Sequence, residues 1–236
     1  MLQFLLAVRS LHMPGVPLLL CPGVLSLKPL HRCRQTFSGQ KGRENVLIHK
    51  DEVELGIYDA RVPYGAHIAF FWQNENEFKD SVGFLEAGLK GKDHCIIVQN
   101  QHIIYPLMRN LLERECDLAR LLAEERLIIL QPDNDAYRMA TSIGEAIQVG
   151  LAHGAPCVRL LGSPGWGDPG WPAEENLIKL EETYTRSIAE LPCVFVCLYD
   201  LRAVSDRIVK IAGAGAHEWE IRAGVVRQNP GNPQRV

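Results

Sequence analysis

Short apolar runs alternate with longer amphipathic segments along the chain from Glu44 onward. The apolar runs are rich in Ile, Val, Leu and Cys and do not alternate strictly with polar residues, which is typical of strands covered on both faces. Between these runs, apolar residues recur at helical spacing, and Met139, Ile143, Ile147 and Leu151 would share one helix face. The alternation predicts an α/β domain with a mostly parallel sheet and helices on both faces.

The same pattern gives each expected element a range. The expected strands are residues 66–72, 94–99, 127–131, 157–161, 193–199 and 219–226. The expected helices are residues 75–90, 103–115, 117–123, 135–153, 173–191 and 205–212. Between the strand at 157–161 and the helix at 173–191 lies the segment GSPGWGDPGWP, residues 162–172. It is so rich in Gly and Pro that we expect a long structured loop there.

The ends of the chain differ from this pattern. Residues 1–43 contain no Asp or Glu, and their apolar runs are shorter than the roughly 20 residues that a membrane span needs. We interpret them as a disordered extension or as the product of a start codon placed too early. Residues 44–227 are expected to form one domain, and residues 228–236, which lack periodicity, a flexible tail.

The charge and the cysteines of the chain indicate which partners and which cellular compartment to expect. Six of the 25 basic residues lie within the first 43, so residues 44–236 carry 19 basic against 28 acidic residues, a net charge of about −9. An acidic surface repels phosphate backbones and anionic lipids, so we expect no direct nucleic-acid partner and no membrane partner. Most of the seven cysteines lie in apolar runs, which is typical of buried thiols in a reducing, cytoplasmic compartment.

The expected sheet also indicates where a ligand would bind, because ligands of open α/β sheets bind at the carboxyl ends of the strands. The candidate ligand-binding residues at or near those ends are Trp72, Gln73, Ser163, Trp166, Tyr199 and Asp200. Two further candidates are His67, at the start of the first strand, and Glu181, on the helix that follows the long loop. A buried structural role for His67 and a solvated one for Glu181 are the alternatives.

The first strand-to-helix turn argues against nucleotide chemistry. In nucleotide-binding domains this turn supplies glycine-backed N–H groups, and in P-loop proteins also a Lys, but residues 72–77 contain neither Gly nor Lys and include Glu75 and Glu77. No Gly-x-Ser-x-Gly or His-Glu-x-x-His motif occurs, and Asp133-Asn134-Asp135 is interpreted as a turn and helix N-cap. We therefore predict a non-catalytic protein with no cofactor and no metal ion.

Several motifs resemble one family. They are VPYGAH at 62–67, FFW at 70–72, FLEAGL at 84–89, GSPGW at 162–166, LIKLE at 177–181, VCLYD at 196–200, His217 and Asn229-Pro230. Together they are similar to the MEDS domain, a sensory domain of methanogen and methylotroph regulators such as DcmR, from Gly56 to Pro230. Two positions depart from the family pattern: Glu218 replaces a Pro, and Ser163-Pro164-Gly165 replaces Glu-Met-Ser.

The resemblance implies a three-layer fold like RecA or KaiC without the phosphate-binding loop, and a role in sensing small hydrocarbon derivatives. It also implies output through a separate partner, such as a kinase or transcription regulator. We expect the ligand pocket to lie between Trp72, Trp166, Glu181 and Tyr199, whose aromatic walls would suit a mostly apolar ligand. Two alternatives stay open. One is a protein-interaction module without a ligand, and the other is an enzyme that uses Cys197 and His67, which would require these two side chains to be within hydrogen-bond reach.

Overall fold

The expected mostly parallel sheet forms in the computed structural model, which describes residues 52–211 and 215–229. Within these residues, seven strands form one sheet in the order β5-β4-β6-β7-β3-β8-β9, and all neighbours are parallel except β8 and β9. The strands are β3 (Ala66–Trp72), β4 (His94–Val98), β5 (Leu127–Leu130), β6 (Val158–Gly162), β7 (Cys193–Asp200), β8 (Trp219–Arg222) and β9 (Val225–Gln228). The interpretation of residues 1–43 lies outside the described residues.

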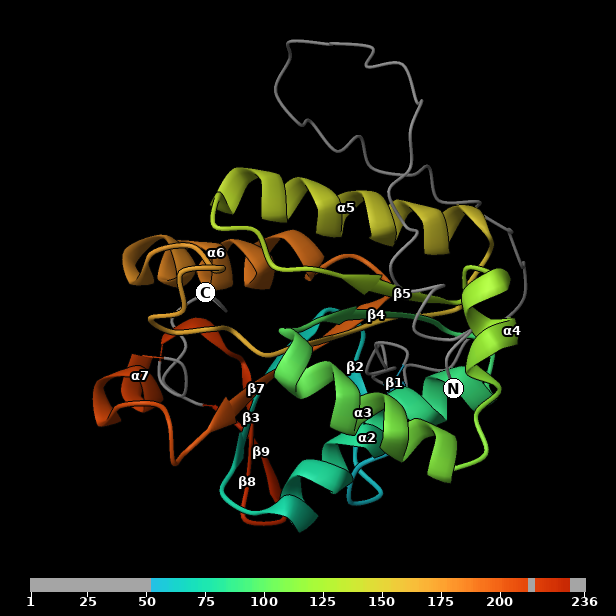
Figure 1. The fold of residues 1–236 in the computed structure, drawn as a ribbon, viewed down its shortest axis with the longest axis horizontal. Coiled ribbons are helices and arrows are strands. Elements are labelled where there is room, and N and C mark those ends of the chain that lie inside the picture. The colour runs from blue at the N-terminus through green and yellow to red at the C-terminus, as the bar shows by residue number, and fades with distance from the viewer. Residues whose placement is uncertain (1–51, 212–214, 230–236) are drawn as a thin grey trace, which may run out of the picture. The chain divides into compact units, whose positions relative to one another are not determined.

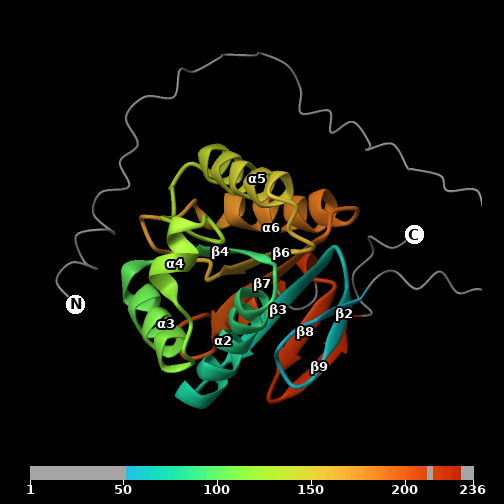
Figure 2. The ribbon, with the colours of Figure 1, turned by 90° about the vertical axis from the view of Figure 1, so that its right-hand side faces the viewer.

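Helices cover both faces of this sheet (Figure 1). They are α2 (Glu75–Lys90), α3 (Gln101–Glu113), α4 (Leu118–Ala123), α5 (Ala136–Ala152), α6 (Glu174–Ile188) and α7 (Asp206–Ile211). Helices α5 and α6 pack on one face and α2 and α3 on the other, as both views show (Figures 1 and 2). This three-layer arrangement explains why β3 and β6 are buried along their whole length.

Two strand assignments differ from the sequence-based prediction. The expected single strand over residues 219–226 is a hairpin, β8 and β9, because Ala223 and Gly224 both adopt positive φ angles, 48° and 76°, and reverse the chain. The short antiparallel pair β1 (Glu52–Glu54) and β2 (Arg61–Pro63) was not predicted, since three-residue strands carry too little periodicity. Gln228, where the tail was expected to begin, is the last residue of β9.

The central strand β3 presents alternate side chains to the two helical layers. His67 contacts Thr185 of α6, so the face that carries His67, Ala69 and Phe71 is turned toward α6. Trp72 packs on Phe78 of α2, with ring centroids 5.2 Å apart, and therefore lies on the opposite face. This alternation decides which of the candidate site residues can meet.

A buried arginine, paired with an aspartate, joins the β1–β2 hairpin to the sheet. Arg159 of β6 is 4% exposed and lies 2.6 Å from the Asp93 carboxylate. Its guanidinium also donates to the backbone carbonyls of Glu54, Leu55 and Phe84. The charge is thus fully hydrogen-bonded, which is the condition under which a buried arginine is tolerated. In the part of the chain that is described, no helix is both long and apolar enough to cross a membrane.

Candidate functional site

A cluster of four buried polar side chains lies between α6 and the centre of the sheet. His67 and His217 are fully buried, and Glu181 and Cys197 are each 4% exposed. Among the residues the structure describes, this is the one group of His, Cys, Asp or Glu side chains whose ligand atoms, all within 4.8 Å of one another, could hold a metal ion. We refer to these four residues as the His-Glu-Cys cluster.

Four different segments supply the cluster. His67 and Cys197 come from the adjacent parallel strands β3 and β7, where Ala69 is paired with Cys197. Glu181 lies on α6, one turn before Thr185, so both project from the same helix face. His217 lies just before β8, on the other side of β3, where the Glu218 N–H donates to the carbonyl of His67. The cluster therefore depends on the strand order of the sheet.

The side chains of the cluster are in direct contact. Nε2 of His67 lies 3.2 Å from Oε2 of Glu181 and 3.3 Å from Sγ of Cys197. The same carboxylate oxygen lies 3.2 Å from Nε2 of His217 and 3.5 Å from the Cys197 sulfur. The two imidazole rings are stacked at a tilt, with centroids 4.1 Å apart. Glu181 is thus the common partner of the other three groups.

Burial controls the protonation states in the cluster. Burial and the neighbouring His217 lower the pKa of His67 to about 4, so its imidazole is neutral near pH 7. Burial and the Glu181 charge raise the pKa of the Cys197 thiol well above its ordinary value. Burial acts to raise the pKa of Glu181, but its contacts with His217 and His67 outweigh burial and lower that pKa. The cluster near neutral pH therefore holds a carboxylate, a neutral thiol and a neutral His67.

Two of the predicted ligand residues extend this cluster toward the carboxyl edge of the sheet. The Tyr199 ring packs edge-on against His217 at 5.7 Å between centroids, and Trp166 stacks on Tyr199 at 6.3 Å. The Trp166 indole N–H and the Tyr199 hydroxyl are buried and have no hydrogen-bond partner among the residues that the structure describes. The structure therefore brings His67, Glu181, Tyr199 and Trp166 into one connected group.

The other predicted ligand residues lie outside this group. Trp72 faces α2, beneath the guanidinium of Arg202 at 4.6 Å, and is thus separated by the sheet from Glu181. Arg202 also forms a two-point ion pair with Asp200; burial acts to raise the pKa of Asp200, but the hydrogen bonds from Arg202 outweigh it and lower that pKa. These side chains do not form the single pocket that the sequence suggested.

Gln73 and Ser163 likewise make contacts within the protein. The backbone N–H of Gln73 donates to the Glu77 carboxylate at 2.7 Å, and Asn74 caps the Glu77 N–H at 3.1 Å. The N-terminus of α2, where a phosphate would bind in a nucleotide-binding fold, is thus occupied by the chain's own side chains. The Ser163 hydroxyl lies 3.5 Å from the carbonyl oxygen of Leu198.

A hollow of about 370 Å³ lies at the carboxyl edge, under the long loop. It is lined by Asn134, Gly167, Asp168, Pro169, Trp171, Pro172, Ala173 and Glu174. Trp171 is held in place by an indole N–H donated to Asn100, which in turn donates to Asp168 at 2.6 Å. The loop that forms this hollow is the loop that carries Trp166.

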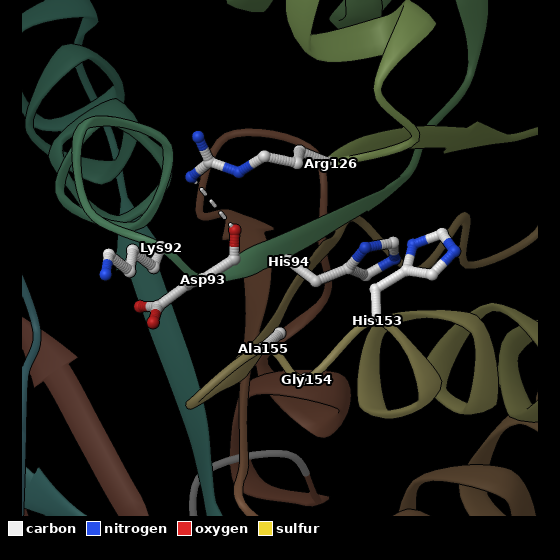
Figure 3. Close-up of a pocket in the computed structure, with 7 residues that line it drawn as sticks. All are labelled: Lys92, Asp93, His94, Arg126, His153, Gly154 and Ala155. Atoms are coloured by element: carbon white, nitrogen blue, oxygen red, sulfur yellow. Dashed lines mark hydrogen bonds between the residues drawn. The ribbon is translucent and has the colours of Figure 1, made fainter.

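A second hollow, of about 260 Å³, lies at the amino edge, where β4 begins (Figure 3). Arg126 lines this hollow. Its guanidinium donates to four backbone carbonyls between the end of α2 and the start of β4, including that of Asp93. His94 and His153 lie side by side in it, and burial together with His153 lowers the pKa of His94. No sequence pattern had pointed to this edge.

Sequence reasoning did not assign two residues of the central group to the site. Thr185 contacts His67, and His217 completes the cluster. Thr185 had a signal, because it lies four residues after Glu181 on the same predicted helix. His217 was noted only as part of the family resemblance, and its place along the chain offered no sign of this contact, since only the pairing of β8 with β3 brings it next to His67.

Comparisons with known proteins agree with this architecture. A KaiC-like protein of the hyperthermophilic archaeon Pyrococcus horikoshii OT3 has a similar structure, with a TM-score of 0.54 and 12% sequence identity over 72% of this chain and 79% of that chain. At this identity the likeness shows the fold alone, and the fold is KaiC-like, as expected. No curated protein matched the sequence. The sequence profile named MEthanogen/methylotroph, DcmR Sensory domain matches residues 66–214, more than half of the chain, and the chain therefore belongs to the MEDS family.

Proposed function

We propose that this domain binds a small organic ligand in the carboxyl-edge hollow, without catalysis, and signals through a separate protein. Its family membership supports a sensory role in general. The observation that carries the ligand proposal is that one loop both lines the hollow and places Trp166 on Tyr199, which touches His217. A ligand that moves this loop would change the packing around the buried cluster.

The lining suggests the kind of ligand. Trp171, Pro169 and Pro172 offer apolar surface, whereas Asp168 and Glu174 offer carboxylates. Carboxylates attract hydrogen-bond donors and repel anions, and a hollow of this volume accommodates a small molecule. We therefore expect a neutral or cationic hydrocarbon derivative, such as a short-chain alcohol or amine, to bind in preference to the carboxylic acid of the same chain length.

Thermal denaturation with matched alcohols, amines and acids tests this proposal. A ligand at 100 times its dissociation constant stabilises the folded state by about 2.7 kcal/mol, which raises the midpoint measurably. In the variant Asn134→Trp, the added indole should fill the hollow and abolish the shift. The matched control is Lys92→Trp at the amino-edge hollow, which should leave the shift intact. No shift with any compound would favour the alternative of a protein-interaction module.

The non-catalytic part of the proposal concerns Cys197 and His67. Their 3.3 Å separation is within hydrogen-bond reach, as an enzyme that uses this pair would require. However, both side chains are buried, and Glu181 lies beside the sulfur, where its charge opposes formation of a thiolate. We therefore expect Cys197 to resist iodoacetamide at pH 8 in the folded protein, as followed by mass spectrometry of the Cys197 peptide. Rapid alkylation there would favour the enzyme.

The signalling part is tested with the same ligand. A partner that receives the signal should bind with different affinity to the ligand-free and ligand-bound forms of the domain. Co-purification from the native host, with and without a stabilising compound, should therefore recover the partner in unequal amounts. The Asn134→Trp variant should recover equal amounts of the partner under both conditions. If the wild-type chain also recovers equal amounts with and without the compound, this would contradict signalling by this route.

A further inference from the structure

The His-Glu-Cys cluster has the composition and spacing of a transition-metal site. We propose that Nε2 of His67, Nε2 of His217, a carboxylate oxygen of Glu181 and the Cys197 thiolate bind one zinc-class divalent ion. This inference does not depend on the ligand proposal, because it concerns different atoms. It departs from the prediction of no metal site, which was based on the absence of ligand spacing along the sequence.

Four of the six distances between donor atoms fit tetrahedral coordination. Zinc binds nitrogen and oxygen at roughly 2.0–2.2 Å and sulfur at about 2.3 Å, so its ligand atoms in a tetrahedron lie roughly 3.2–3.8 Å apart. The contacts of Glu181 Oε2 with the two histidine nitrogens are both 3.2 Å. The Cys197 sulfur lies 3.3 Å from His67 Nε2 and 3.5 Å from Glu181 Oε2. These four separations match donors arranged around one small ion, and the other two pairs of donor atoms lie within 4.8 Å.

Hydrogen bonding orients His67 as metal-binding histidines are oriented. The Thr185 hydroxyl donates to the backbone carbonyl of Ala216, so its oxygen accepts from Nδ1–H of His67, 2.8 Å away. With Nδ1 engaged by Thr185, Nε2 is the ring atom that faces Glu181 and Cys197, at 3.2 Å and 3.3 Å, and is free to serve as the ligand atom. Metal-binding histidines typically donate their second ring nitrogen to such an outer partner.

The charge of the buried Glu181 carboxylate also favours a divalent ion. Among the described residues, the ion-pair partners of Glu181 are the two histidines, and no Lys or Arg pairs with it. A buried carboxylate without a cation is expensive. A divalent ion held by one carboxylate, one thiolate and two neutral imidazoles would give the buried site no net charge.

The set of ligands also limits what the metal would do. Four protein donors fill a tetrahedral zinc ion and leave no position for water or substrate, which is the arrangement of structural zinc sites rather than hydrolytic ones. Nitrogen, oxygen and sulfur donors together favour zinc or a similar transition metal over magnesium or calcium. We therefore infer a structural ion that ties β3, β7, α6 and the segment before β8 together.

Cobalt substitution tests this inference in the full chain. The background variant Cys21→Ala/Cys33→Ala removes the two thiols that precede the described residues, and the protein is prepared without a histidine tag. After chelation, titration with Co²⁺ should saturate at one ion per chain, with the visible bands of tetrahedral cobalt and a thiolate-to-cobalt charge-transfer band. Zinc should then displace the cobalt, and chelation should lower the midpoint of thermal unfolding.

Matched variants assign the sulfur. Cys197→Ala should abolish the charge-transfer band and weaken zinc binding by more than the roughly 10–100-fold that loss of an outer partner causes. Cys193→Ala is the control, because Cys193 is also buried in β7 and contributes no ligand atom to the cluster. A band that survives Cys197→Ala, or one lost equally in Cys193→Ala, would overturn the assignment. If Cys197→Ala does not fold, the Cys21→Ala/Cys33→Ala protein still tests the proposal, since absence of the tetrahedral cobalt bands in that protein excludes the site.

Discussion

Thr185 fixes the orientation of His67 through a 2.8 Å contact between its hydroxyl oxygen and Nδ1. Replacement by the near-isosteric valine leaves the Nδ1 group and the Ala216 carbonyl without this partner in a buried site. We expect Thr185→Val to lower the free energy of unfolding by about 1–3 kcal/mol, as measured by chemical denaturation. If the cluster binds zinc, the same change should weaken zinc binding about 10–100-fold.

Thr183→Val is the matched control for this prediction. Thr183 lies on the same helix and its hydroxyl donates to the backbone carbonyl four residues earlier, but it is exposed, whereas Glu181 and Thr185 are buried. It should therefore change neither stability nor metal binding appreciably. Equal losses in the two variants would show that helix propensity, not the contact with His67, explains the effect.

The buried ion pair between Arg159 and Asp93 should be much more important to stability than a comparable pair on the surface. Asp93→Asn removes the charge that compensates a guanidinium that is 4% exposed, and breaking such a pair typically lowers stability by about 3–5 kcal/mol. Asp133→Asn removes the partner of the exposed Arg138, and its effect should be far smaller. Urea denaturation of both variants measures the difference, and similar midpoints would contradict the role of Asp93 in compensating the buried charge of Arg159.

Two glycines of α5 should respond in opposite ways to alanine. A Cβ atom at Gly144 would meet nothing within 4 Å, so Gly144→Ala should stabilise the helix by roughly 0.5–1 kcal/mol through its lower unfolded-state entropy. A Cβ atom at Gly150 would lie 2.6 Å from the ring of His94, so Gly150→Ala should destabilise the protein by about 1–3 kcal/mol. Thermal unfolding of the two variants should shift in opposite directions, and a common direction would be inconsistent with this packing.

The hydrophobic pattern predicted the layers of the fold because it indicates which residues are buried. In this chain, the spacing of the buried residues distinguishes the strands from the helices. It did not predict which side chains meet. The numbers 67, 181, 197 and 217 show no metal-ligand spacing, and the four side chains come together only through the order β7-β3-β8. Trp72 was placed with Glu181 because Trp72 ends a strand and Glu181 lies on the helix that follows the loop at the strand ends, although the position of Trp72 one residue from Phe71 already assigns it to the other face of β3.

We expect no nucleotide binding because of a specific structure at the start of α2. In a RecA-like or KaiC-like fold, the N–H groups of this turn would hold phosphate oxygens. Here the Glu77 carboxylate accepts the Gln73 N–H at 2.7 Å and Asn74 accepts the Glu77 N–H at 3.1 Å, so these donors are already used. Glu75, in the same turn, adds a second negative charge.

We therefore expect no ATP hydrolysis and no affinity for Mg-ATP tighter than about millimolar, which corresponds to roughly −4 kcal/mol. Isothermal titration calorimetry measures this directly. The variant Glu75→Gln/Glu77→Gln separates the two causes, since it removes the charges but keeps groups able to accept hydrogen bonds. It should still not bind ATP, because the turn would lack both glycine and lysine. A micromolar dissociation constant for the wild-type chain, lost on changes within residues 72–77, would show that the phosphate site has been retained and would refute the interpretation of this turn.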